Sequence, residues 1–72
     1  MIANMNFAEA VRRIRKERLL SQEDFAKDLG VAFTTVNRWE NGKSKPSYKA
    51  MKALNDYCKQ YSIDVSIADM ED

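Results

Sequence analysis

The sequence predicts an all-α protein, a compact bundle of four to five helices that contains a helix-turn-helix motif. Two short helix-forming segments, 22–29 and 33–41, are separated by a tight turn around Gly30. Apolar residues recur at spacings of three and four both before and after this pair, which is typical of helices with one buried face. Seventy-two residues suffice for one domain with a small core.

The first expected helix runs over about residues 7–18 and carries an apolar stripe facing the core. The stripe consists of Phe7, Ala10, Val11 and Ile14. The opposite face of this helix is basic and belongs to the run RRIRKER. It is either a solvated surface or a surface that lies along the phosphates flanking a DNA site.

The second and third expected helices form the helix-turn-helix. Ser21 is a favourable N-cap for the first of them, and Gly30 suits a left-handed helix end. Ala26 is small enough for close helix packing, and Val36 points back at the preceding helix. Trp39 lies one turn after Val36, so both face inward. The spacing therefore predicts two closely packed helices with one outward face on the second.

A fourth helix is expected to begin at Pro46, since proline is tolerated in a first helical turn. Its stripe consists of Ala50, Met51, Leu54, Tyr57 and Cys58. After residue 60, Ile63, Val65 and Ile67 alternate with polar residues, the period of a short strand. That segment can lie on the domain, pair with a second chain or be disordered.

The central segment closely resembles the Xre/Cro-repressor type of helix-turn-helix, the family of lambda-like phage repressors. The matching residues lie at 20–23, 25–26, 29–31, 35–36, 38–43 and 45–47. The resemblance implies sequence-specific binding of duplex DNA by a small transcription regulator, here a repressor of phage or mobile-element type on a palindromic operator. Two positions depart from the family. Leu19 replaces a helix-ending glycine, and Ala32 replaces a hydroxyl cap, so we expect a left-handed leucine and an uncapped third helix whose start can shift to Thr34 or Thr35.

The outward face of the third helix carries the expected DNA contacts. An α-helix fits the major groove and reads bases near its N-terminus. The expected base contacts are Phe33, Thr34, Asn37 and Arg38. The expected phosphate contacts are Gln22, Asn41, Lys43 and Lys45. Phe33 could instead pack against the second helix or a partner chain, and the polar side chains could be a solvated face.

The family resemblance also assigns a structural ion pair. A glutamate at the place of Glu40 pairs in the family with an arginine of the first helix, and Arg15 occupies the matching place. We expect this pair to hold the first helix against the third. The alternative is an exposed pair that contributes little.

Composition and charge exclude several functions. The chain has no histidine and a lone cysteine, Cys58, so we expect no zinc site, no cofactor, no internal disulfide and no catalysis. The same cysteine usage predicts a cytoplasmic setting. No apolar run reaches membrane length, and no small-molecule ligand is indicated. Residues 1–60 carry twelve basic and seven acidic side chains, whereas the last twelve residues carry four acids and no base.

This charge division predicts a DNA-binding domain at 1–61 and an acidic tail at 62–72. The tail is a possible dimerisation segment, and a homodimer would suit a palindrome. The main alternative to DNA binding is an antitoxin or adaptor that uses the same motif to bind another protein. A small nuclease or modification-enzyme accessory is a further alternative, which a metal-dependence assay would test.

Overall fold

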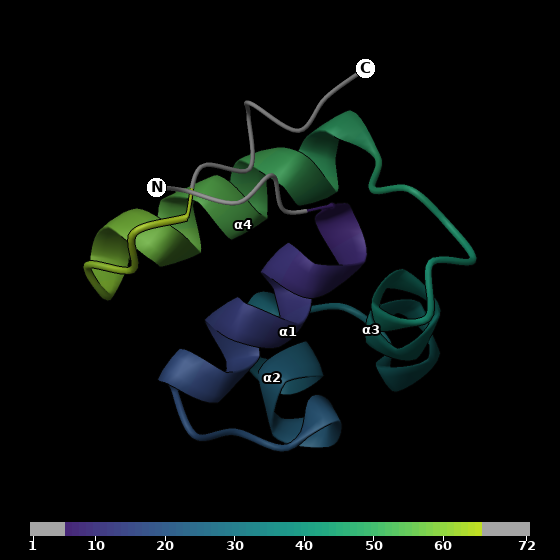
Figure 1. Ribbon diagram of the computed structural model, residues 1–72, viewed down its shortest axis with the longest axis horizontal. Coiled ribbons are helices and arrows are strands. Elements are labelled where there is room, and N and C mark those ends of the chain that lie inside the picture. The colour runs from purple at the N-terminus through teal and green to yellow at the C-terminus, as the bar shows by residue number, and fades with distance from the viewer. Residues whose placement is uncertain (1–5, 66–72) are drawn as a thin grey trace.

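The structure, a computed structural model, describes residues 6–65 and contains four helices in that range (Figure 1). They are α1 (Phe7–Glu17), α2 (Gln22–Leu29), α3 (Phe33–Glu40) and α4 (Tyr48–Gln60). No strand occurs between residues 6 and 65. The predicted all-α fold with a helix-turn-helix is therefore confirmed, and the described range contains neither a fifth helix nor the possible short strand.

Three of the four helices begin with a side-chain cap. At α1 the Asn6 side chain accepts from the Glu9 amide (2.9 Å), while the Asn6 amide donates to the Glu9 carboxylate (3.1 Å). Ser21 caps α2 and Ser47 caps α4 in the usual way. Ala32 precedes α3 without any side-chain cap, as predicted, and the helix start does not shift to a threonine. The recognition-helix candidate thus begins without a local stabilising cap.

The prediction that Pro46 begins the fourth helix was wrong. The helix starts at Tyr48, and Ser47 is its N-cap in an extended conformation. The Ser47 hydroxyl accepts a hydrogen bond from the amide of Ala50 at 3.1 Å. Because proline offers no such acceptor, the helix begins after the serine and Pro46 stays in the loop.

Each of the four helices is followed within two residues by a left-handed residue, and two of these positions were predicted. Gly30 ends α2 with φ 77°, and Leu19 follows α1 with φ 56°. The left-handed leucine predicted from the sequence is thus present, although α1 ends at Glu17 and Arg18 is its C-cap. The Leu19 side chain is 92% exposed, so it provides no compensating burial. Leucine in this conformation is strained by about 1–2 kcal/mol.

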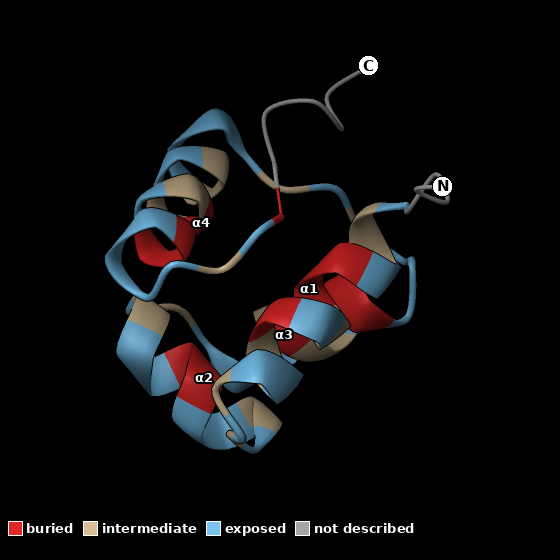
Figure 2. Ribbon diagram, turned by 60° about the vertical axis from the view of Figure 1, so that its left-hand side comes forward, coloured by how far each residue is buried: buried red, intermediate tan, exposed pale blue. Residues whose placement is uncertain are grey.

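The core lies where the inner faces of all four helices meet (Figure 2). Helix α3 packs against both α1 and α2, and α4 contacts α2. Trp39 meets Phe7 edge-on at 5.7 Å between ring centroids, and Phe25 meets Tyr57 in the same way at 5.4 Å. The fully buried side chains of largest volume are Phe25, Ile14, Leu54, Val11 and Val36. This packing holds α3 with one face inward and the other outward.

The segment after α4 folds back onto the same core. The Ile63 amide donates to the carbonyl of Cys58 at 2.8 Å, and Val65 is 7% exposed within the core cluster. Of the three alternatives for this segment, the structure shows that Ile63 and Val65 lie on the domain. Ile67 and the rest of the expected acidic tail fall outside the described range. The sequence places the end of the domain at residue 61, whereas the core continues to Val65.

A polar and aromatic cluster joins the C-terminal ends of α1, α2 and α4. Arg18 donates from Nε to the Tyr57 hydroxyl at 3.1 Å and lies 3.7 Å from the centroid of the Tyr61 ring. The Tyr57 hydroxyl donates to Asp28 at 3.1 Å, and Asp28 also faces Arg18 at 3.6 Å. We call these four residues the α4 cluster.

Candidate nucleic-acid interface

Helix α3 separates an inner from an outer face as a recognition helix requires. Val36 and Trp39 are buried, with exposures of 0% and 3%. The residues predicted to contact bases or phosphates from this helix all lie on the other side: Phe33, Thr34, Arg38 and Asn41 are exposed, and Asn37 is half-buried. Phe33 is 45% exposed, so it is not packed away beneath α2.

The loop after α3 places two lysines beside this face. Gly42, in a left-handed conformation with φ 71°, turns the chain at the end of the helix. The Lys43 amide donates to the carbonyl of Arg38 at 2.9 Å, which holds the loop against the last turn. The side chains of Lys43 and Lys45 are exposed. These basic side chains extend the polar outer face of α3 into the loop that follows the helix.

A bidentate ion pair lies directly beneath the outer face. Arg15 of α1 donates to the two carboxylate oxygens of Glu40 from Nε (2.7 Å) and Nη2 (3.0 Å). The Glu40 side chain is 4% exposed and the Arg15 side chain 18%. The hydrogen bond to Glu40 raises the pKa of Arg15 above its ordinary value. The pair that the family resemblance assigned is thus mostly buried, and it joins α1 to the last turn of α3.

Two further contacts, neither of them predicted from the sequence, hold this region together. The Arg12 guanidinium donates to the backbone carbonyl of Glu40, a favourable place for a cation at a helix C-terminus. Arg15 also donates from Nη1 to the carbonyl of Leu20 at 3.0 Å. Arg12 and Arg15 are three residues apart and so share one face of α1, a spacing that could have indicated a joint role.

Gln22 connects this ion pair to the outer face of α3. Its Nε2 donates to Glu40 Oε1 at 3.0 Å, and its Oε1 accepts from Asn37 Nδ2 at 3.1 Å. Asn37 Oδ1 in turn accepts from Asn41 Nδ2 at 3.1 Å. We call Gln22, Asn37 and Asn41 the amide chain. The i, i+4 spacing of the two asparagines is visible in the sequence, but their link to Gln22 depends on how α2 and α3 pack.

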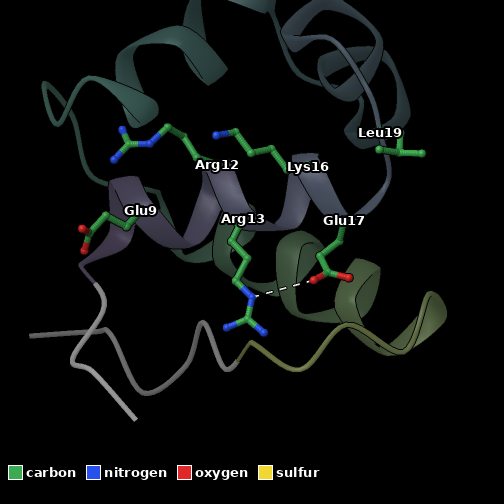
Figure 3. Close-up of a pocket in the computed structure, with 6 residues that line it drawn as sticks. All are labelled: Glu9, Arg12, Arg13, Lys16, Glu17 and Leu19. Carbon is green, nitrogen blue, oxygen red and sulfur yellow. Dashed lines mark ion pairs between the residues drawn. The ribbon is translucent and has the colours of Figure 1, made fainter.

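The hollow on the solvent side of α1 does not form an enclosed ligand site (Figure 3). Its lining comes from one helix and the turn after it: Glu9, Arg12, Arg13, Lys16, Glu17 and Leu19. Arg13 and Glu17 pair across one helical turn at 3.9 Å, with both side chains about half exposed. Arg12 and Lys16 point away from that pair. The charges here are of both signs and partly paired, as on an ordinary solvated helix face.

Neither a membrane span nor a metal cluster is present in the described part of the chain. None of its helices is both long enough and apolar enough to cross a bilayer. Between residues 6 and 65, no group of three or more His, Cys, Asp and Glu side chains is placed to hold a metal ion. Cys58 is buried, and this burial raises the pKa of its thiol.

Comparison with known proteins agrees with this geometry. The profile of the helix-turn-helix family matches residues 11–65, most of the chain. The chain is 32% identical over 53 residues to the HTH-type transcriptional activator BcrR of Enterococcus faecalis. This alignment covers 74% of the chain but only 26% of that relative. No solved structure matches the chain significantly. The chain therefore belongs to the Xre and lambda-repressor-like helix-turn-helix family of DNA-binding transcription regulators.

Proposed function

We propose that this chain binds duplex DNA in a sequence-specific manner through the outer face of α3, and so regulates transcription. The observation that carries the proposal is the division of α3 into a buried side, at Val36 and Trp39, and a polar side. A helix presented in this way fits the major groove, where each base pair shows a distinct set of donors and acceptors.

The proposed contacts divide into two classes. The proposed contacts to base edges come from Phe33, Thr34, Asn37 and Arg38. Among them, Arg38 would bind guanine and Phe33 would contact the methyl group of thymine. Gln22, Asn41, Lys43 and Lys45 would contact phosphates, which position the protein and contribute most of its salt dependence. The opening turn of α2 adds its own free N–H groups beside Gln22, which favours an anion there.

The finer form of the proposal is a non-enzymatic repressor of phage or mobile-element type that acts in the cytoplasm on a palindromic operator. Single domains of this size bind few base pairs, so two copies on half-sites about 34 Å apart would give useful specificity. The name of the relative in E. faecalis describes an activator, and an activator would use the same face. A reporter gene downstream of the selected operator would separate repression from activation.

Selection of bound sequences from a random duplex pool, followed by binding isotherms, tests the proposal. Arg38→Ala should weaken binding to the selected site by about 1–3 kcal/mol and relax the preference at one base pair. Circular dichroism should show an unchanged fold, because Arg38 is exposed.

Lys43→Ala tests whether the loop lysine binds phosphates, which position the protein on DNA, without contributing to its base preference. It should weaken binding to selected and random duplexes equally and lower the salt slope by about one. Lys59→Ala is the matched control, because Lys59 is exposed near the end of α4 that lies away from α3 (Figure 1). No affinity for duplex DNA at low salt would reject the proposal in favour of a protein-binding adaptor or antitoxin.

A further inference from the structure

The first turn of α3 carries an apolar corner on an otherwise polar outer face. We give this name to Ala32, the residue before the helix, together with Phe33 and Thr34, its first two residues. All three are exposed, the Phe33 side chain to 45%, and none belongs to the core cluster or to the apolar residues packed against it. The apolar corner therefore offers a phenyl ring and two methyl groups to whatever meets this end of α3.

The missing helix cap makes this corner more apolar. The other three helices between residues 6 and 65 are preceded by Asn6, Ser21 and Ser47, and each of these side chains accepts a hydrogen bond from a helix amide. Ala32 makes no such bond, although a capping side chain would stabilise the helix. A methyl group thus stands beside Phe33 where the other helices have a hydroxyl or an amide.

The major groove of DNA has one apolar group that suits this corner. Thymine carries a methyl group at C5, and the side chains that contact it are those of Ala, Phe and, through its methyl group, Thr. The other three bases lack this methyl group and are read through hydrogen-bond donors and acceptors. Residues near the N-terminus of a recognition helix reach base edges, so the apolar corner is placed to pack against a C5-methyl group.

The same side chains do not distinguish what lies beside that methyl group on the pyrimidine ring. At C4, thymine has an oxygen that accepts, whereas cytosine has an amine that donates. Ala32 and Phe33 have no polar side-chain atom, and the Thr34 hydroxyl can either donate or accept. The apolar corner can therefore tell a C5-methyl group from a C5 hydrogen, but it cannot tell thymine from 5-methylcytosine.

We infer that the apolar corner recognises the C5-methyl group of a pyrimidine, so that the chain accepts 5-methylcytosine where it prefers thymine. The inference deepens the proposed function and rests on it. Methylation of an operator cytosine opposite the apolar corner would strengthen binding by roughly fourfold, the scale of one buried methyl group. The ligands of this chain would then include duplex DNA that is methylated at cytosine C5.

Two matched pairs of duplexes isolate the methyl group from the rest of the base pair. Thymine and uracil, each paired with adenine, differ only at C5. Cytosine and 5-methylcytosine, each paired with guanine, also differ only at C5. The affinity ratio within each pair is therefore a methyl ratio, and a contact from Asn37 or Arg38 to the purine cancels from it.

The first measurement finds the position and the size of the effect in the unmodified protein. Each thymine of the operator selected from random duplexes is replaced in turn by uracil. One replacement should weaken binding by roughly fourfold because the apolar corner loses its methyl contact. At that position, 5-methylcytosine should bind more tightly than cytosine by a similar factor.

The second measurement assigns the effect to the apolar corner. Phe33→Gln should bring both methyl ratios toward one, whereas Phe33→Leu, of similar size but apolar, should retain most of each. Thr34→Ser, which removes one methyl group and keeps the hydroxyl, should lower both ratios in part. The matched control is Tyr48→Gln, because Tyr48 is an exposed aromatic residue at the first position of α4, and it should leave both ratios unchanged.

The failures of the inference and of the proposed function are distinguishable. A preference for thymine over uracil without one for 5-methylcytosine over cytosine would overturn the inference and leave the proposed function intact. Methyl ratios that stay unchanged in both Phe33→Gln and Thr34→Ser would do the same. Failure of the unmodified protein to bind any duplex would reject the proposed function and this inference together.

Discussion

Two arginines one turn apart, Arg15 in α1 and Arg18 at its C-cap, form ion pairs in contrasting surroundings. Arg15 meets Glu40 through two short hydrogen bonds, and the two side chains are 18% and 4% exposed. Arg18 meets Asp28 at 3.6 Å, with exposures of 29% and 40%. Similar chemical groups thus make a buried cross-link in one place and a solvated contact in the other. Burial decides how much each pair contributes to stability, because water screens the second pair far more than the first.

The two regions also hold their helices by different means. The C-terminal end of α3 is held by charge, since Arg15 and Arg12 both donate to Glu40. The C-terminal end of α4 is held mainly by aromatic packing in the α4 cluster, where Tyr57 contacts both Phe25 and Tyr61. The outer face of α3 should therefore be sensitive to loss of one carboxylate, whereas α4 should tolerate it.

The largest expected effect is that of Glu40→Ala, which leaves the mostly buried Arg15 without its partner. We expect a loss of about 3 kcal/mol in the free energy of unfolding, the lower end of the range for a broken buried pair because Arg15 keeps some exposure. Urea denaturation measures it, with Asp28→Ala as the matched change in the exposed pair. Equal losses in the two variants would contradict the contrast between the regions.

Tyr57→Phe should have an intermediate effect, about 1 kcal/mol, because it removes the hydroxyl that joins Arg18 to Asp28 and retains the ring packing. The pKa of Tyr57 is raised, first by burial, so the folded state holds this proton more tightly than the unfolded chain. The resulting stabilisation is full below the ordinary value of 10.0 and is lost as pH rises through the higher folded value.

The pH dependence of unfolding provides a second measurement on the same variant. The unmodified protein should lose stability as pH rises above about 10, and Tyr57→Phe should lose less. The raised pKa of Cys58 adds a similar alkaline loss to both proteins, so Cys58→Ala in each background is the control. A stability profile that Tyr57→Phe leaves unaltered would mean that the hydroxyl contributes nothing to the α4 cluster.

A smaller change in stability, of opposite sign, is expected at Leu19 in the turn between α1 and α2. Leu19→Gly should stabilise the domain by about 0.5–1 kcal/mol, because relief of left-handed strain exceeds the entropy that glycine adds to the unfolded chain. The leucine side chain is 92% exposed, so its removal sacrifices no packing. Thermal melts of both forms test this, and a lower melting temperature for the glycine form would refute it.

The smallest effect should come from Asp28→Asn, which neutralises the exposed acid and keeps an oxygen to accept from Tyr57. The melting temperature should fall slightly at low salt, and the difference should vanish near 1 M salt, where the Debye length is about 3 Å. The effect of Glu40→Ala should persist at that salt concentration. A salt-independent effect of Asp28→Asn would show that the Arg18–Asp28 contact is less solvated than its exposure indicates.

The local elements of the fold were predictable because their causes lie within a few residues. The apolar spacing located the four helices, Ser21 and Gly30 bounded α2, and the inward positions of Val36 and Trp39 followed from the helical period. The prediction at Pro46 failed because a proline and the serine after it are both favoured near a helix start, and only the hydrogen bond of Ser47 decided between them.

The sequence by itself determined the four helices, the caps of α2 at Ser21 and Gly30, the strained turn at Leu19, and which face of α3 is polar, because these depend on neighbours along the chain. The tertiary structure decided what those faces meet. Residues 63–65 alternate like a strand, yet Val65 completes the helical core because α4 brings its end over that core. Gln22, Asn37 and Glu40 come from two helices, and their bonds exist only because α2 and α3 cross at a separation that matches the reach of the glutamine. Contacts of this kind depend on packing, which no local pattern records.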